Sequence, residues 1–373
     1  MKSGQISSPD KNIKLLMMKS ILNQASISKN HDIMRLSLPI PSIKIVNEGI
    51  AMNNITKFIL KLFSSPKIDM QENYLQVRRL QEFIQQPPKD SYRILDRQIY
   101  AEDMSHEIPV RIFQPKEKRS DEILLFFHGG GWVLGSIDTY TRDCIRMTDK
   151  TGRAVLAVDY SKAPEHPFPA GFDDCFRVAE VLINRPELTG LHNAENLVLI
   201  GNSAGANLAA AVSLRLRDEG KQLPHKQILI NPVTYWNHDE RSPFQSIEEN
   251  GYDYGLTNKK LREYMEMYAA DEKVRQSPYV SPIMADDLVN QPATLIITSQ
   301  FDPLRDEGEA YGQLLWQAGN EVRIFQAKNT IHNYLFGPIS TDSDEKTYRL
   351  IEDYLENRLK GSDAYGEEKG YQP

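Results

Sequence analysis

Cysteine is scarce in this sequence: Cys144 and Cys175 are the only two among 373 residues. Two isolated thiols provide neither a disulfide framework nor the clustered ligands of a zinc site, and they fit a reducing compartment. We therefore expect a cytoplasmic protein that binds no metal.

Long apolar runs are also missing, because no stretch approaches the roughly 20 apolar residues that a membrane-spanning helix needs. Lys14 and Lys19 interrupt the apolar segment at residues 13–22, which leaves its core too short for a signal peptide. We expect no stable membrane insertion. Weak association of this segment with a membrane surface stays open.

Neither sign of charge dominates. The 44 Lys and Arg residues are interspersed with 51 Asp and Glu residues, for a net charge of −7. This balance argues against a nucleic-acid partner. The length allows one large domain or two ordinary ones, and a homo-oligomer stays open.

The first 50 residues are irregular, with serines and prolines as breakers, and we interpret them as a partly disordered N-terminal extension. Apolar residues then recur with helical spacing at residues 52–63, and a second helix is expected at 73–85. Strand-like stretches at 92–100 and 110–114 predict an antiparallel hairpin.

From residue 123 onward, aliphatic runs alternate with helical patterns, which predicts an α/β fold: a mainly parallel twisted sheet with helices on both faces. The expected strands are residues 123–127, 154–158, 197–200, 228–230, 294–298 and 322–325. Residues 235–287 interrupt this alternation with a polar and aromatic insertion that contains one helix at 259–268. We expect a single domain over residues 51–360, followed by a polar tail at 361–373.

The sequence Gly201-Asn202-Ser203-Ala204-Gly205 follows one of these strands and precedes an alanine-rich helical stretch. A strand, a sharp turn and a helix with this G-x-S-x-G pattern expose the serine at the top of a sheet, and Gly201 and Gly205 permit the tight bend. Ser203 is therefore the candidate nucleophile.

A second glycine-rich segment, His128-Gly129-Gly130-Gly131-Trp132, follows the strand at 123–127. It offers backbone N–H groups that can stabilise the negative charge formed when a serine attacks a carbonyl. A dinucleotide fingerprint would need glycine at position 134, where Leu134 stands, so we expect no cofactor. We expect His128 to hold this loop by hydrogen bonding, although simple packing stays open.

A serine nucleophile needs a histidine base, and three histidines follow Ser203. His225 lies in a polar link before a strand, and His238 lies in a polar loop that we interpret as solvated. His332 lies beyond the strand at 322–325, where open α/β sheets place their sites, and Asp302 is equally placed after the strand at 294–298. The order Ser203, Asp302, His332 is that of serine hydrolases built on such sheets.

With these motifs in order, the chain resembles the hormone-sensitive-lipase-like family of α/β-hydrolase serine esterases. The resemblance runs from about Ile94 to near Arg358, and it also includes Asp159-Tyr160 with the segment at 163–170 and the segment at 302–308. It implies an α/β-hydrolase fold whose helical cap is formed by residues 51–88 and 235–287. It also implies a triad of Ser203, Asp302 and His332, and an oxyanion hole made by the N–H groups of Gly130, Gly131 and Ala204. His128, Gly129, Gly201 and Gly205 would support the site.

The resemblance implies a serine carboxylic-ester hydrolase that acts on small-molecule esters with short- to medium-chain acyl groups through an acyl-enzyme. Bulky cap residues would shorten the acyl channel, namely Tyr235, Trp236, Phe244, Tyr252 and Tyr254. An amidase, peptidase or deacetylase that uses the same triad stays open. A non-catalytic receptor is disfavoured because all three triad residues are present.

Six residues at four places in the chain depart from the family pattern. Asn202 stands where many relatives have Asp, and Ala206 stands where a further glycine is usual. Ser161-Lys162 replaces Arg-Leu, and Asn333-Tyr334 replaces the Gly-Phe that often follows the histidine. None of these changes a reacting group, so they bear on substrate preference.

Overall fold

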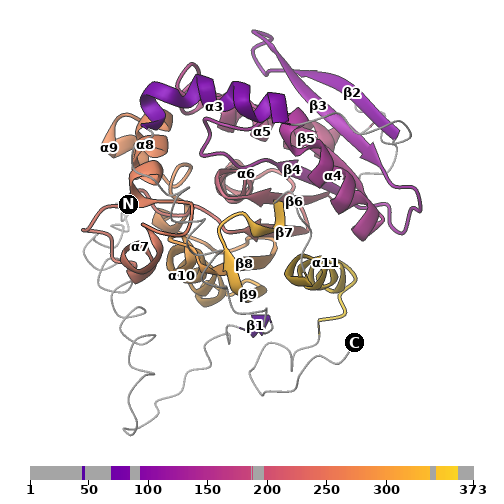
Figure 1. Ribbon diagram of the computed structural model, residues 1–373. Helices are drawn as coiled ribbons and strands as arrows, with labels where there is room; N and C mark the ends of the chain where they lie inside the picture. Colours follow the sequence, from indigo (N-terminus) through magenta and orange to yellow (C-terminus); the bar gives the residue numbers. More distant parts are fainter. Residues whose placement is uncertain are drawn as a thin grey trace, which may run out of the picture.

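One mixed sheet of nine strands organises the described part of the chain (Figure 1). The computed structural model describes residues 44–46, 69–84, 93–185, 187, 197–336 and 342–359. The strand order is β1-β9-β8-β7-β6-β4-β5-β3-β2, parallel throughout except at the β2–β3–β5 edge. The bounds are β1 Lys44–Val46, β2 Arg93–Tyr100, β3 Glu107–Gln114, β4 Ile123–Phe127, β5 Ala154–Val158, β6 Leu197–Asn202, β7 Lys226–Ile230, β8 Ala293–Phe301 and β9 Val322–Ile331.

Helices cover both faces of this sheet, which explains why its central strands are continuous aliphatic runs. Every residue of β4, β5, β6 and β7 is buried. Neighbouring residues of one strand enter opposite cores: Leu125 belongs to the larger apolar cluster and Phe126 to the smaller. This alternation follows from the two-residue period of a strand.

The helices that pack on the faces are α4 Ile137–Thr151, α5 Ala170–Asn184, α6 Ala204–Asp218, α10 Arg305–Gln317 and α11 Asp342–Leu355. Helices α6 and α10 contact the strands on one face, with α5 packed against α6. Helices α4 and α11 pack together and share the smaller apolar cluster on the other face. The predicted α/β class, with a mainly parallel sheet and helices on both faces, is confirmed.

The two segments expected to form a cap meet each other. The first contributes α3 Met70–Ile84; the second contributes α7 Gln245–Asn250, α8 Asn258–Tyr268, α9 Glu272–Arg275 and the 3₁₀ turn η3 Pro282–Met284. The Met70 N–H donates to Glu263 Oε2 of α8 over 3.0 Å, and Gln71 Nε2 donates to Glu266 Oε2 over 2.8 Å. The helix expected at 52–63 lies outside the described residues.

Several strands begin or end two or three residues away from the expected bounds, and two strands, β1 and β9, differ more. Residues 44–46, placed in the N-terminal extension, form β1 and pair with Phe325, Gln326 and Ala327 of β9. A run of three residues is too short for any periodicity to reveal. Strand β9 continues to Ile331, beyond the expected end at 325, because its polar second half still pairs with β8 across a bulge at Ser299/Phe301. The rest of the extension and the tail at 361–373 lie outside the described residues.

Cys144 and Cys175 are both free and buried. They lie in separate apolar clusters. No helix in the described ranges has the length and apolar character to cross a membrane.

Candidate active site

Ser203 stands on a sharp turn between β6 and α6, with a left-handed φ of 56°. Few residues other than glycine adopt this backbone, so the turn holds strain of the kind that is common at active sites. Gly201 and Gly205 are required in this turn because a side chain at either position would clash with the backbone. A Cβ added to Gly201 would lie 2.2 Å from Gly205 O, and one added to Gly205 would lie 1.9 Å from Phe127 O.

Three strand ends bring Ser203, Asp302 and His332 together. Each of these residues directly follows the last residue of β6, β8 or β9 respectively. Because the three strands run parallel, their carboxyl ends meet at one edge of the sheet. His332 Nδ1 donates to Asp302 Oδ2 over 2.8 Å, and Ser203 Oγ lies 3.0 Å from His332 Nε2.

The Asp302 carboxylate is fully buried and its orientation is fixed. Its second oxygen, Oδ1, accepts the Leu304 N–H over 2.9 Å. Asn250 of α7 also donates to the Asp302 backbone carbonyl over 3.3 Å. A carboxylate held in this way selects the histidine tautomer with hydrogen on Nδ1, which leaves Nε2 free to accept a proton.

The glycine loop beside Ser203 has an unusual backbone, with positive φ angles of 116° at Gly130, 61° at Gly131 and 60° at Trp132. The N–H groups of Val133 and Leu134 donate back to Gly130 O over 3.1 and 2.8 Å. Among the described residues, none accepts a hydrogen bond from the N–H of Gly130, Gly131 or Ala204. Those donors are therefore available to a ligand.

His128 lies behind this loop. Its Nδ1 donates to the neighbouring Gly129 carbonyl over 2.8 Å, and its ring stacks on Tyr160 with centroids 4.3 Å apart. Burial, reinforced by the nearby Lys162 charge, lowers the pKa of His128 to about 4. The imidazole is consequently neutral near pH 7 and holds the loop as a hydrogen-bond donor.

The other two histidines lie in separate environments. His225 is partly exposed and pairs with Glu122 Oε1 over 3.0 Å. The expectation of a solvated loop around His238 is wrong, because this side chain is only 1% exposed and contacts Glu307 Oε2 over 3.0 Å. Its polar neighbours in sequence gave no sign of this partner, which comes from α10.

Helix α8 lies directly on the glycine loop. Trp132 stacks on Tyr268 with centroids 4.3 Å apart, which assigns Trp132 to packing. A Cβ added to Gly131 would lie 2.4 Å from the Tyr264 ring, so Tyr264 covers the loop beside the predicted oxyanion donors. None of the sequence motifs predicts this position of Tyr264, although its spacing of four residues from Tyr268 is a detectable signal.

The remaining expected cap residues divide into two groups. Tyr235 packs edge-on against Phe244, and Tyr254 stacks on Phe301, the residue before Asp302. Tyr252 is 62% exposed, so its side chain gives the site little cover. Helix α3 is tied down by Arg78, which pairs with Glu165 and donates to the Val133 carbonyl over 2.7 Å.

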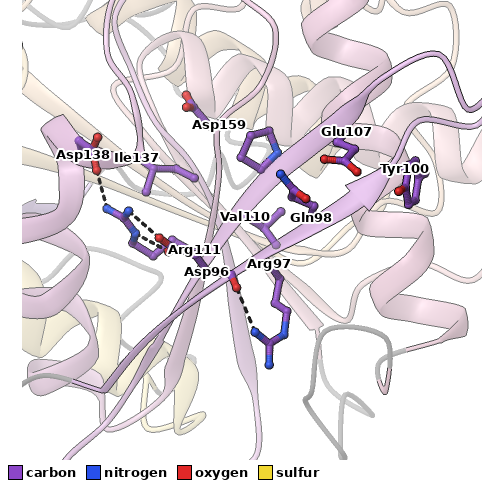
Figure 2. Close-up of a pocket in the computed structure, with 11 residues that line it drawn as sticks. Asp96, Arg97, Gln98, Tyr100, Glu107, Val110, Arg111, Ile137, Asp138 and Asp159 are labelled. Atoms are coloured by element: carbon purple, nitrogen blue, oxygen red, sulfur yellow. Dashed lines mark hydrogen bonds and ion pairs between the residues drawn. The ribbon is translucent and has the colours of Figure 1, made fainter.

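A cavity of about 550 Å³ lies elsewhere, along the β2–β3 hairpin and the start of α4 (Figure 2). None of the triad residues lines it. Its central cation, Arg111, is already paired with Asp96 and Asp138, each over 2.6 Å. The cavity therefore presents no unpaired reactive group comparable to Ser203.

Comparison with known proteins identifies the family of the chain. Residues 124–336, more than half of the chain, match the α/β hydrolase fold family. An arylesterase of Saccharolobus solfataricus is 34% identical over 252 residues, which is 67% of this chain and 80% of that protein. An ethyl acetate hydrolase of Pseudomonas putida is 30% identical, over 66% of this chain and 78% of that protein.

A solved esterase structure has a similar fold. The hyperthermophilic esterase of Pyrobaculum calidifontis superposes with a TM-score of 0.72 at 29% identity, over 83% of this chain and 99% of that one. In the part of the chain that is described, no group of three or more His, Cys, Asp or Glu residues could hold a metal ion. The chain belongs to the hormone-sensitive-lipase-like family of α/β hydrolases, and it is a hydrolytic enzyme.

Proposed function

We propose that the protein is a serine carboxylic-ester hydrolase whose triad is Ser203, His332 and Asp302. The observation that carries this proposal is the hydrogen-bond chain from Asp302 through His332 to Ser203, with contacts of 2.8 and 3.0 Å. Each contact has the geometry that a proton transfer needs in the resting enzyme.

The reaction proceeds in two halves. Ser203 Oγ attacks the ester carbonyl carbon as its proton passes to His332 Nε2, and the buried Asp302 carboxylate stabilises the resulting imidazolium. His332 then protonates the departing alkoxide, which leaves the acyl group on Ser203. In the second half His332 takes a proton from water, the hydroxide attacks the acyl-enzyme, and Ser203 recovers its proton as the acid departs.

The oxyanion of each tetrahedral intermediate is held by the N–H groups of Gly130, Gly131 and Ala204. Support comes from their lack of any other acceptor among the described residues and from the positive φ angles that shape the loop. Such preorganised donors contribute most when charge develops in a site that excludes water. Tyr264 and Trp132 exclude water on one side, because both are almost fully buried against the loop.

The substrate class follows from the cap and from the relatives. The Tyr264 ring lies beside Gly131, and the Tyr254 ring stacks on Phe301, the residue before Asp302. These rings limit the room for a long acyl chain. Relatives are named arylesterase and ethyl acetate hydrolase, and both names describe small esters. We therefore assign short- to medium-chain acyl esters as substrates.

The test uses two serine variants and a chromogenic acetate ester. Ser203→Ala should lower kcat by on the order of 10³-fold or more, because it removes the nucleophile. Ser105→Ala is a matched control, since Ser105 Oγ also lies 3.0 Å from a histidine, His106, that contacts a carboxylate, Asp174. That control should retain full activity because Ser105 lies in the β2–β3 turn, away from the glycine loop. Near-normal turnover by Ser203→Ala would overturn the assignment.

A further inference from the structure

Asn202 and Asn333 flank the predicted nucleophile and base. Asn202 directly precedes Ser203, and Asn333 directly follows His332. Both stand where the sequence departs from the family pattern, and they contact each other: Asn202 Nδ2 donates to Asn333 Oδ1 over 2.5 Å. We propose that this amide pair is a positioning device that holds the His332 loop against the serine turn, an inference that rests on the proposed function.

The Asn202 side of the pair is rigid. Asn202 ends the buried strand β6 and is 1% exposed. Its Oδ1 is buried and accepts no hydrogen bond from the described residues. The side chain has two polar partners, Asn333 and the Tyr140 hydroxyl, and only the bond to Asn333 reaches the His332 loop. A Cβ on Gly129 would lie 2.9 Å from Asn202 Nδ2, so the amide also abuts the glycine loop. The amide pair therefore contacts the serine turn, the His332 loop and the glycine loop.

The Asn333 side explains why an asparagine suits this position. Asn333 has a left-handed φ of 65°, which glycine adopts freely and asparagine tolerates better than most residues. Asparagine thus keeps the backbone of the turn and adds an amide that glycine lacks. Next to it, Tyr334 Oη bonds to Thr347 Oγ1 of α11 over 2.6 Å. The loop is therefore fixed at two successive residues, at Asn333 by Asn202 and at Tyr334 by Thr347.

A fixed loop matters because the imidazole must meet two partners at once. Its contacts to Asp302 and Ser203, at 2.8 and 3.0 Å, leave little tolerance for a shift of the loop. Misplacement of a catalytic group by about 1 Å can lower a rate by about a hundredfold. Loss of the pair should consequently lower kcat and leave substrate binding almost unchanged.

Asn333→Gly is the central variant because it removes the amide without straining the left-handed backbone. We expect kcat to fall roughly tenfold while KM stays within about threefold. Asn333→Asp keeps an acceptor for Asn202 and should recover most of the loss above pH 8. The matched control is Asn290→Gly, which makes the same change at an exposed residue with φ 55° and should leave kcat unaltered.

A double-mutant cycle separates positioning from simple stability. If the pair acts as a unit, Asn202→Ala combined with Asn333→Gly should be no slower than the worse single variant. Additive losses, or an Asn333→Gly enzyme that melts earlier with unchanged kcat, would overturn the proposal. Labelling of Ser203 by a fluorophosphonate probe should slow in step with kcat. The rate of Ser203 labelling can still be compared if the wild-type protein does not hydrolyse esters. That failure would contradict the proposed function and not the positioning role of the amide pair.

Discussion

Three histidines follow Ser203 in the chain, and the residue that each one contacts gives it a different role. His332 joins a buried carboxylate to a serine hydroxyl, which is the arrangement of a general base. His238 contacts Glu307, whose other carboxylate oxygen accepts the Thr234 N–H over 2.7 Å. This pair therefore stabilises the start of the insertion at residues 235–287. His225 contacts Glu122 just before the start of β4, away from Ser203.

Replacement of these histidines should separate chemistry from folding. His332→Ala should lower kcat to within about tenfold of Ser203→Ala, because triad members act as a unit. His238→Ala should chiefly lower the free energy of unfolding, by about 1–3 kcal/mol, because Glu307 loses a buried partner. Steady-state rates and urea denaturation measure the two effects. A His238→Ala enzyme that is slower than His332→Ala would show that the base has been misassigned.

At the scale of elements, the contact between α4 and α11 contains a buried acid that the mechanism does not use. Asp143 is 6% exposed, and burial raises its pKa to about 7 from an ordinary value of 3.8. The folded state therefore holds this proton more tightly than the unfolded chain does. The free energy of unfolding should decrease as pH rises from about 4 to about 7, because the folded protein must then bury a carboxylate.

Asp143→Asn should remove this pH dependence. Asparagine has nearly the same volume and stays neutral, so the variant should exceed the wild type in stability at pH 8, by on the order of a few kcal/mol. The difference should disappear near pH 4, where Asp143 is protonated. Urea titrations at both pH values measure it. Asp138→Asn, on the same helix but with a side chain that is 75% exposed, is the control. An equal gain from both variants would refute burial as the cause.

At the scale of the whole molecule, the local sequence pattern predicted the strands and the residues that follow from their parallel order. The aliphatic runs gave the bounds of β4 and β5, and parallel order placed Ser203, Asp302 and His332 at one edge of the sheet. Contacts between distant polar side chains were not predictable in this way. His238 and Glu307 lie 69 positions apart, and Asn202 and Asn333 lie 131 apart. Nothing periodic links such pairs, because only the completed fold brings them together.

The proposed cap over the sheet edge leads to a prediction about acyl chains. Each methylene buried in an apolar channel adds about 0.8 kcal/mol of binding, until the channel is full. Beyond that point, further methylenes force strained packing and the gain reverses. We therefore expect kcat/KM for aryl esters to be highest between acetate and about hexanoate, and to be low for emulsified long-chain triglycerides.

Tyr264 gives this prediction a structural control. Its ring covers Gly131, so Tyr264→Ala should open the channel and move the preferred acyl length upward by several methylenes. Tyr252→Ala removes a similar ring from a side chain that is 62% exposed, and it should leave the preference unchanged. A series of nitrophenyl esters from acetate to dodecanoate measures both. Rates that rise steadily to the dodecanoate in the wild type, or that jump at a lipid interface, would show that the cap does not limit chain length and that the enzyme is a lipase.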